Sequence, residues 1–78
     1  MRPKQQRIVL AFSSTAAALE FESKAETAGF TGRLFPVPSS ITAGCGLAWQ
    51  ESTEHSDALR LFLQEHDFGE VKWVEMLV

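Results

Sequence analysis

A single cysteine, Cys45, is the one thiol nucleophile in this chain of 78 residues. It stands between Gly44 and Gly46, whose lack of a side chain allows positive φ angles and lets another molecule approach closely. Free cysteine is nevertheless among the most buried residue types in proteins. The sequence therefore leaves two roles open for Cys45, either an accessible reacting thiol or a side chain packed in the core.

A helix that begins without acidic residues is predicted from Thr15 to Ala28, directly after Ser13 and Ser14. The first turn of a helix has unpaired N–H groups and a partial positive charge, and no Asp or Glu precedes Glu20 here. Ser14 and Thr15 could thus help this terminus to bind an anion, such as a thiolate of Cys45, whose pKa would then fall below about 8.5. The alternative for Ser14 is an ordinary helix cap.

The remaining elements follow from apolar periodicity and from turn residues. Strands are predicted at 7–12, 33–37, 47–50 and 71–78, the first helix ends at Gly29, and a second helix runs from a cap at Ser52 or Thr53 to about His66. Pro36 and Pro38 lack N–H groups on the same side of the second strand, which is tolerated only at a sheet edge. The predicted fold is a single α+β domain, the ferredoxin-like split β-α-β-β-α-β arrangement, preceded by a flexible basic tail at 1–6.

This topology predicts which residues share an end of the sheet. With the spatial strand order four-one-three-two, the turn into the first helix lies at the same end as the loop 39–46, which contains Cys45. The end of the second helix, with His66 and Asp67, returns to that end, and His55 lies at the opposite one. A pair of Cys45 with His66 is a secondary hypothesis. One cysteine and two distant histidines do not supply the ligands of a zinc site, so we expect neither a metal nor a cofactor.

Composition and charge exclude several other classes of protein. Three basic residues and no acidic one precede Glu20, whereas ten acidic and four basic residues stand from Glu20 onwards, for a net charge of −3. This balance disfavours nucleic-acid binding, and we expect Trp49 and Trp73 to cover the core or a partner surface instead of stacking on bases. No apolar run approaches the roughly 20 residues of a membrane span, and a lone thiol fits the cytoplasm. Apolar residues on both faces of the last strand suggest a homodimer through the open sheet face.

An ordered set of residues resembles a small bacterial family of selenium/sulfur carrier-like proteins whose function is otherwise unknown. The resemblance covers about 8–49. It consists of Phe12-Ser13-Ser14-Thr15, then Ala18-Leu19, Glu22 and Gly29, then Arg33-Leu34-Phe35-Pro36-Val37-Pro38, and finally Gly44-Cys45-Gly46-Leu47. It implies that a single cysteine, here Cys45, carries sulfur or selenium as a persulfide-type adduct. Members of the family commonly have an arginine after the Pro-x-Pro, where this chain has Ser39.

The leading hypothesis is a thiol carrier that receives the atom from a donor protein and passes it to an acceptor protein. Such a protein is a co-substrate and not an enzyme with turnover. The backbone at Ser14 and Thr15 would stabilise the adduct, Arg33 would assist, and Gly44 and Gly46 would give access to it. The alternative is a non-catalytic binding or regulatory module in which Cys45 is incidental.

Overall fold

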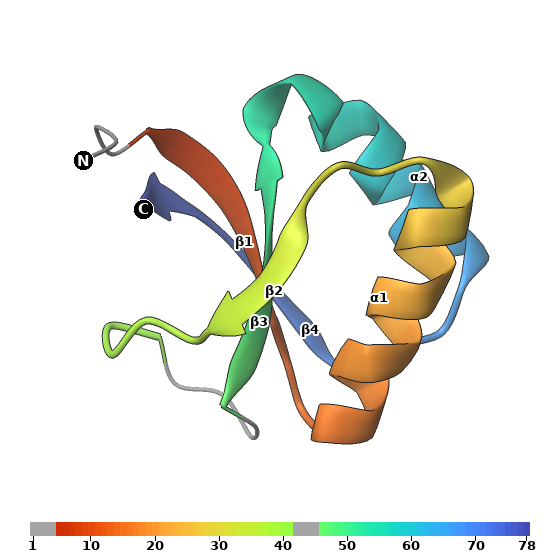
Figure 1. The fold of residues 1–78 in the computed structure, drawn as a ribbon, viewed down its shortest axis with the longest axis horizontal. Coiled ribbons are helices and arrows are strands. Elements are labelled where there is room, and N and C mark those ends of the chain that lie inside the picture. The colour runs from red at the N-terminus through yellow and green to blue at the C-terminus, as the bar shows by residue number, and fades with distance from the viewer. Residues whose placement is uncertain (1–4, 42–45) are drawn as a thin grey trace.

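A computed structural model of the chain describes residues 5–41 and 46–78. Its elements follow the predicted order: β1 (Gln6–Phe12), α1 (Thr15–Ala28), β2 (Arg33–Pro36), β3 (Leu47–Ser52), the short 3₁₀ helix η1 (Thr53–His55), α2 (Ser56–Glu65) and β4 (Val71–Leu77). The four strands form one antiparallel sheet in the order β2-β3-β1-β4, with both helices on the same face (Figure 1). This confirms the α+β, ferredoxin-like prediction.

The core lies between the helices and one face of the sheet. Alternate residues of β1, among them Ile8, Leu10 and Phe12, point towards the helices and join Phe21 and Trp49 in one buried cluster. Phe21 is at the centre of this cluster, because four aromatic rings lie with their centroids 5.0–5.5 Å from its own. The prediction that Trp49 covers the core is therefore confirmed.

Helix α1 has the predicted bounds, and its end explains why it stops there. Gly29 adopts the left-handed conformation at φ 92°, and its N–H donates to Glu26 O. The next amide, Phe30 N, donates to Ala25 O over 3.0 Å, which completes the Schellman arrangement that favours glycine at this position. The helical spacing of Ala18, Phe21, Ala25 and Ala28 predicts one buried face; the first three are buried, whereas Ala28, in the last turn, is exposed.

Strand β2 occupies the sheet edge that its prolines require. Val37 N donates to Gly46 O over 3.0 Å, so the amide between the two prolines points towards β3. The nitrogens of Pro36 and Pro38 therefore point away from the sheet, where no ladder hydrogen bond is lost.

Several element boundaries differ from the predicted ones, and β2 and β4 each end one residue earlier than predicted. β3 continues to Ser52, two residues beyond the predicted end, and the second helix is divided into η1 and α2, with the Ser52 hydroxyl accepting from Glu54 N at the start of η1. β1 begins at Gln6, and Gln5 exchanges two backbone hydrogen bonds with Val78. Strand pairing thus reaches into the segment expected to be a tail, and the start of β1 lies beside the end of β4 (Figure 1).

No helix within residues 5–41 and 46–78 is both long enough and apolar enough to cross a membrane.

Candidate functional site

The turn into α1, the residue before β3 and the turn before β4 meet at one end of the sheet. Strand pairing places Ala48 opposite Ala11 near the end of β1, and Gly46 lies two residues before Ala48. Gly69, at φ 75°, is packed against Ser13, because a Cβ added to Gly69 would lie 3.5 Å from the Ser13 Oγ. The predicted sharing of this end by the three segments is confirmed.

At this end, Ser14 is the N-cap of α1. Its backbone is extended, at φ −147° and ψ 155°, and its hydroxyl accepts a hydrogen bond of 3.1 Å from Ala17 N. Helical geometry leaves the amides of Thr15 and Ala16 without an acceptor inside the helix. No acidic residue occupies the first turn, and both of these residues are exposed. The Ser14 hydroxyl is thus already used as a cap, while the next two amides remain the groups able to bind an anion.

The predicted carrier residue Cys45 and its neighbour Gly44 lie outside the described residues. Gly46, the other neighbour, is exposed, and its carbonyl accepts from Val37 N where the β2–β3 connection closes. A Cβ added at Gly46 would meet no described atom within 4 Å.

Arg33 is not brought to this end of the sheet. It is exposed at the first position of β2, opposite Gln50, whereas Pro36 at the other end of β2 is opposite Leu47, the residue after Gly46. Leu34 packs against the core on the helix side of the sheet. Its neighbour Arg33 therefore lies on the opposite face of the sheet, away from the helices.

His66 and Asp67 have local partners in the α2–β4 connection. The His66 amide donates to Phe62 O over 3.2 Å, and the imidazole ring packs on Phe62 and Phe68 with centroid distances of 4.7 and 5.8 Å. Asp67 Oδ1 accepts from Gly69 N over 2.9 Å and so forms the turn before β4. The imidazole of His66 therefore faces the gap between the helices.

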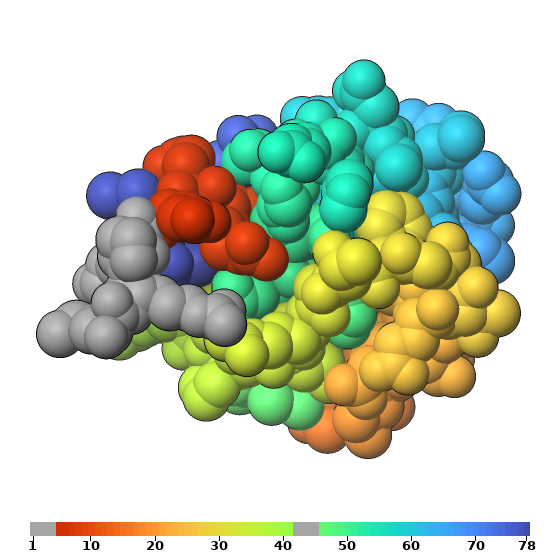
Figure 2. Space-filling view, turned by 45° about the horizontal axis from the view of Figure 1, so that its top comes forward, coloured from red at the N-terminus to blue at the C-terminus, as the bar shows by residue number. Residues whose placement is uncertain are grey.

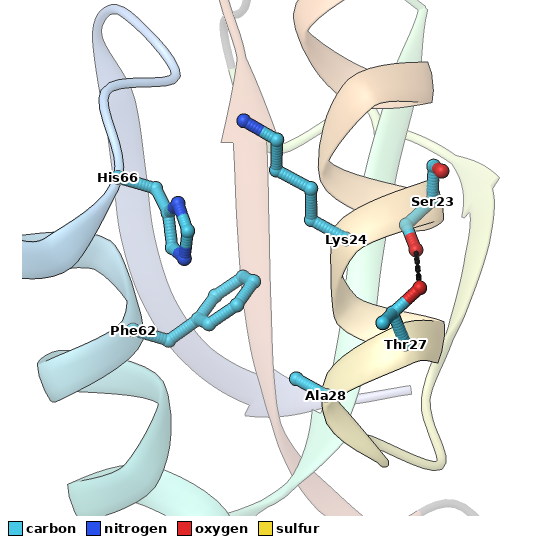
Figure 3. Close-up of a pocket in the computed structure, with 6 residues that line it drawn as sticks. All are labelled: Ser23, Lys24, Thr27, Ala28, Phe62 and His66. Atoms are coloured by element: carbon cyan, nitrogen blue, oxygen red, sulfur yellow. Dashed lines mark hydrogen bonds between the residues drawn. The ribbon is translucent and has the colours of Figure 1, made fainter.

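That gap is a groove of about 300 Å³ between α1 and α2. Figure 3 shows Phe62 and His66 on one side, opposite residues of α1. Two of the polar groups from α1 already have partners, since Thr27 Oγ1 donates to Ser23 O over 3.1 Å and Lys24 Nζ lies 3.3 Å from Glu20 Oε1. The groove is thus mainly an apolar surface.

The most densely hydrogen-bonded polar group of the described residues is one that sequence reasoning missed, the carboxylate of Glu51. Its side chain is fully buried on the helix face of β3. Oε1 accepts from Gly32 N at 3.0 Å and from Trp49 Nε1 at 3.1 Å. Oε2 lies 3.3 Å from Thr31 Oγ1, which donates to it, and 2.7 Å from His55 Nδ1. Since an ionised carboxylate only accepts, Nδ1 is the protonated nitrogen of His55.

This network fastens two connections to the sheet, and both lie at the end opposite Gly46. It joins the α1–β2 connection, through Thr31 and Gly32, to η1, through His55; Figure 2 shows these segments in contact at the surface. The predicted position of His55, away from the Gly46 end, is confirmed. The signal for Glu51 was the alternation of Leu47 and Trp49 on the core face, which continues to residue 51 once β3 is extended.

Burial of the Glu51 carboxyl raises its pKa, but hydrogen bonds from His55, Trp49 and Gly32 and the charge of His55 outweigh burial. The pKa of Glu51 is therefore lower than its usual value of 4.5. Glu51 is ionised at neutral pH, so the network is a carboxylate held by donors.

Replacing Gly32 by alanine tests how closely the α1–β2 connection packs on this network. A Cβ at Gly32 would clash with Gln50 O and would lie 2.6 Å from Trp49 Nε1 and 2.7 Å from Glu51 Oε1. We expect Gly32→Ala to lower the free energy of unfolding by about 2 kcal/mol or more, measured by urea denaturation. The control Gly46→Ala meets no atom and should change it by less than about 0.5 kcal/mol. Equal stabilities of the two variants would contradict this packing.

The described residues contain no group of three or more His, Cys, Asp or Glu side chains placed to hold a metal ion.

The fold and the open N-terminus of α1 define a small ferredoxin-like protein with a candidate anion-binding end. The chain belongs to the family described as "Putative Se/S carrier protein-like", which it matches over residues 7–75. No curated protein and no solved structure shows significant similarity to it.

Proposed function

We propose that this protein carries a sulfur or selenium atom on Cys45 between a donor protein and an acceptor protein. The observation that carries the proposal is membership of the selenium/sulfur carrier-like family over nearly the whole chain, together with the presence of one cysteine. A carrier needs one covalent attachment point, and a sulfane sulfur bonds to a thiolate. Such a lone thiol fits a reducing compartment, so we place the protein in the cytoplasm.

The transfer step is a thiol–persulfide exchange. The Cys45 thiolate attacks the outer sulfur of a persulfide on the donor, the sulfur–sulfur bond of the donor breaks, and the donor thiolate leaves. Cys45 then bears the outer sulfur as a persulfide, and an acceptor nucleophile takes that sulfur and releases the Cys45 thiolate. The exchange is balanced and needs no external oxidant. Selenium would follow the same path through a sulfur–selenium bond.

The N-terminus of α1 supports this chemistry if Cys45 approaches it. Both the thiolate and the persulfide anion are negatively charged. The amides of Thr15 and Ala16 are hydrogen-bond donors at the same end of the sheet as Gly46. The first turn contains no acidic side chain, so no negative charge there repels an anion that approaches the helix N-terminus. Arg33, at the other end of β2, is not needed in this account.

Loading from a cysteine desulfurase tests the proposal. The purified protein is incubated with the desulfurase and L-cysteine and then weighed intact by mass spectrometry. We expect a gain of one sulfur atom that disappears on treatment with a reductant. No adduct from the desulfurase, from inorganic polysulfide or from selenide with an oxidised thiol would overturn the proposal in favour of a binding module with an incidental cysteine.

A further inference from the structure

Strand β4 forms one edge of the sheet, and among residues 5–41 and 46–78 its only neighbouring strand is β1. The opposite edge, β2, has four residues and is protected by Pro36 and Pro38, which have no N–H to donate to a further strand. β4 has seven residues, none of them proline, and all of them pair with β1 in unbroken register. A regular edge of this length is a template for pairing with another strand.

The pairing with β1 determines which backbone groups of β4 point outwards. Gln5 and Val78 exchange two hydrogen bonds, since Gln5 N donates to Val78 O over 3.3 Å and Val78 N donates to Gln5 O over 3.1 Å. Hydrogen-bonded pairs alternate with non-hydrogen-bonded pairs along an antiparallel ladder, so every second residue back from Val78 bonds to β1. The N–H and C=O groups of the residues between them point away from β1: Val71, Trp73, Glu75 and Leu77.

The side chains of these four residues lie on the helix side of the sheet, where Trp73 packs against the core cluster. Leu77 is 58% exposed, and Glu75 is exposed and accepts a hydrogen bond of 3.3 Å from Trp73 Nε1. The guanidinium of Arg60, on α2, lies 4.4 Å from the centre of the Trp73 ring and is in none of the ion pairs of the described residues. An apolar side chain, a carboxylate and a cation thus line this edge.

We propose that β4 is a dimer interface, in which β4 of a second copy pairs with it antiparallel around a twofold axis at Val74. The two sheets then form one continuous sheet, and the outward-pointing groups of each strand bond to those of the other. In this register Trp73 lies opposite Glu75 of the second copy. Val71 lies opposite Leu77 of the second copy, which buries the exposed leucine. The pairing does not depend on the proposed function.

Charge and strand length favour this register and this partner. Arg60 covers the Trp73 ring that Glu75 of the second copy faces, so the two opposite charges come close together. An axis at Glu75 would set two like charges against each other, and an axis at Trp73 would leave Leu77 beyond the end of the other strand. Each copy supplies both halves of every contact, so a second copy is the occupant that fits this edge. The open sheet face is a poorer dimer contact, because the residues at its centre are already buried: Val9, Ala11 and Ala48.

Formation of an intermolecular disulfide tests the register. In a chain with Cys45→Ser, Val74→Cys brings two thiols together at the axis, in a non-hydrogen-bonded pair whose Cα atoms are about 4.5 Å apart. Met76→Cys is the matched control, because Met76 is also half-buried on the open face, but its two copies would be about 13 Å apart along the strands. We expect oxidised glutathione to produce covalent dimers of Val74→Cys at least about tenfold faster. Equal rates, or no covalent dimer of Val74→Cys, would overturn the proposal.

Sedimentation equilibrium of the natural chain, with a thiol reductant present, measures the non-covalent dimer. We expect Leu77→Lys to raise the Kd of the dimer at least about tenfold, because the ammonium would be buried against Val71 of the second copy. Leu19→Lys makes the same change at a leucine of α1 that is 51% exposed, and it should leave the Kd nearly unchanged. A chain that stays monomeric up to about 1 mM, or a dimer that both variants affect equally, would overturn the proposal.

Discussion

Replacing Glu51 by alanine is expected to lower the free energy of unfolding by about 3–5 kcal/mol. A chain of this length has only about 4–12 kcal/mol of stability in total, so the variant would be close to unfolding. The loss is large because the amide of Gly32 and the indole N–H of Trp49 would lose their acceptor inside the protein. His55 would lose its carboxylate partner as well. Urea denaturation followed by circular dichroism measures the effect.

Glu51→Gln keeps the fold measurable and separates charge from packing. The amide retains one acceptor oxygen and a similar volume, so we expect a loss of about 1–3 kcal/mol at neutral pH. Leu61→Ala, which removes an exposed apolar side chain of α2, is a control expected to cost much less. If Glu51→Gln were as stable as the natural chain, the network would be a consequence of the fold and not a support for it.

The natural chain and Glu51→Gln should differ in their response to acid. Because the folded-state pKa of Glu51 lies below its unfolded value, the ionised carboxylate stabilises the fold at pH values above about 4.5, and this contribution is lost as the pH falls through the folded-state pKa. The stability difference between the natural chain and Glu51→Gln should therefore be constant near neutrality and shrink below pH 4.5. A difference that does not depend on pH would contradict the assignment of an ionised Glu51.

The second large effect is expected at Cys45. Cys45→Ser should abolish loading with sulfur completely, because this chain has no other thiol to accept it. The substitution exchanges one atom, and a thiol that serves as an attachment point contributes little to packing, so the free energy of unfolding should change by less than about 1 kcal/mol. Intact mass after desulfurase treatment gives the first quantity, and urea denaturation gives the second. A serine variant that unfolds, or that loses several kcal/mol, would show that Cys45 is a core residue.

The order of the elements could be predicted from the sequence because each has a strong local signal. Helix α1 is bounded by a serine cap and by Gly29 in the left-handed conformation, and β2 is confined to an edge by Pro36 and Pro38. The sharing of one sheet end by Ser14, Gly46 and Gly69 follows from this order alone. Local signals and chain topology agree at these positions, which is why the prediction succeeded.

What escaped prediction depends on contacts between distant parts of the chain. The role of Glu51 requires Gly32, 19 residues earlier, and a β3 that extends past Gln50, where charged and polar residues suggested that the strand had ended. The place of Arg33 depends on the register of β2 against β3, which sets it opposite Gln50 on the open face. The surroundings of Cys45, which lies outside the described residues, are a matter for chemical measurement.

The rate of alkylation of Cys45 by iodoacetamide as a function of pH tests the carrier account most directly. The account predicts a thiol that reacts in the folded protein with a midpoint below the ordinary value of about 8.5, because an exposed thiolate is stabilised by the amides at the start of α1. Ala16→Glu, which places a negative charge beside those amides, should move the midpoint upwards while leaving the fold intact. A thiol that reacts only after unfolding would contradict the account and leave Cys45 as a packing residue.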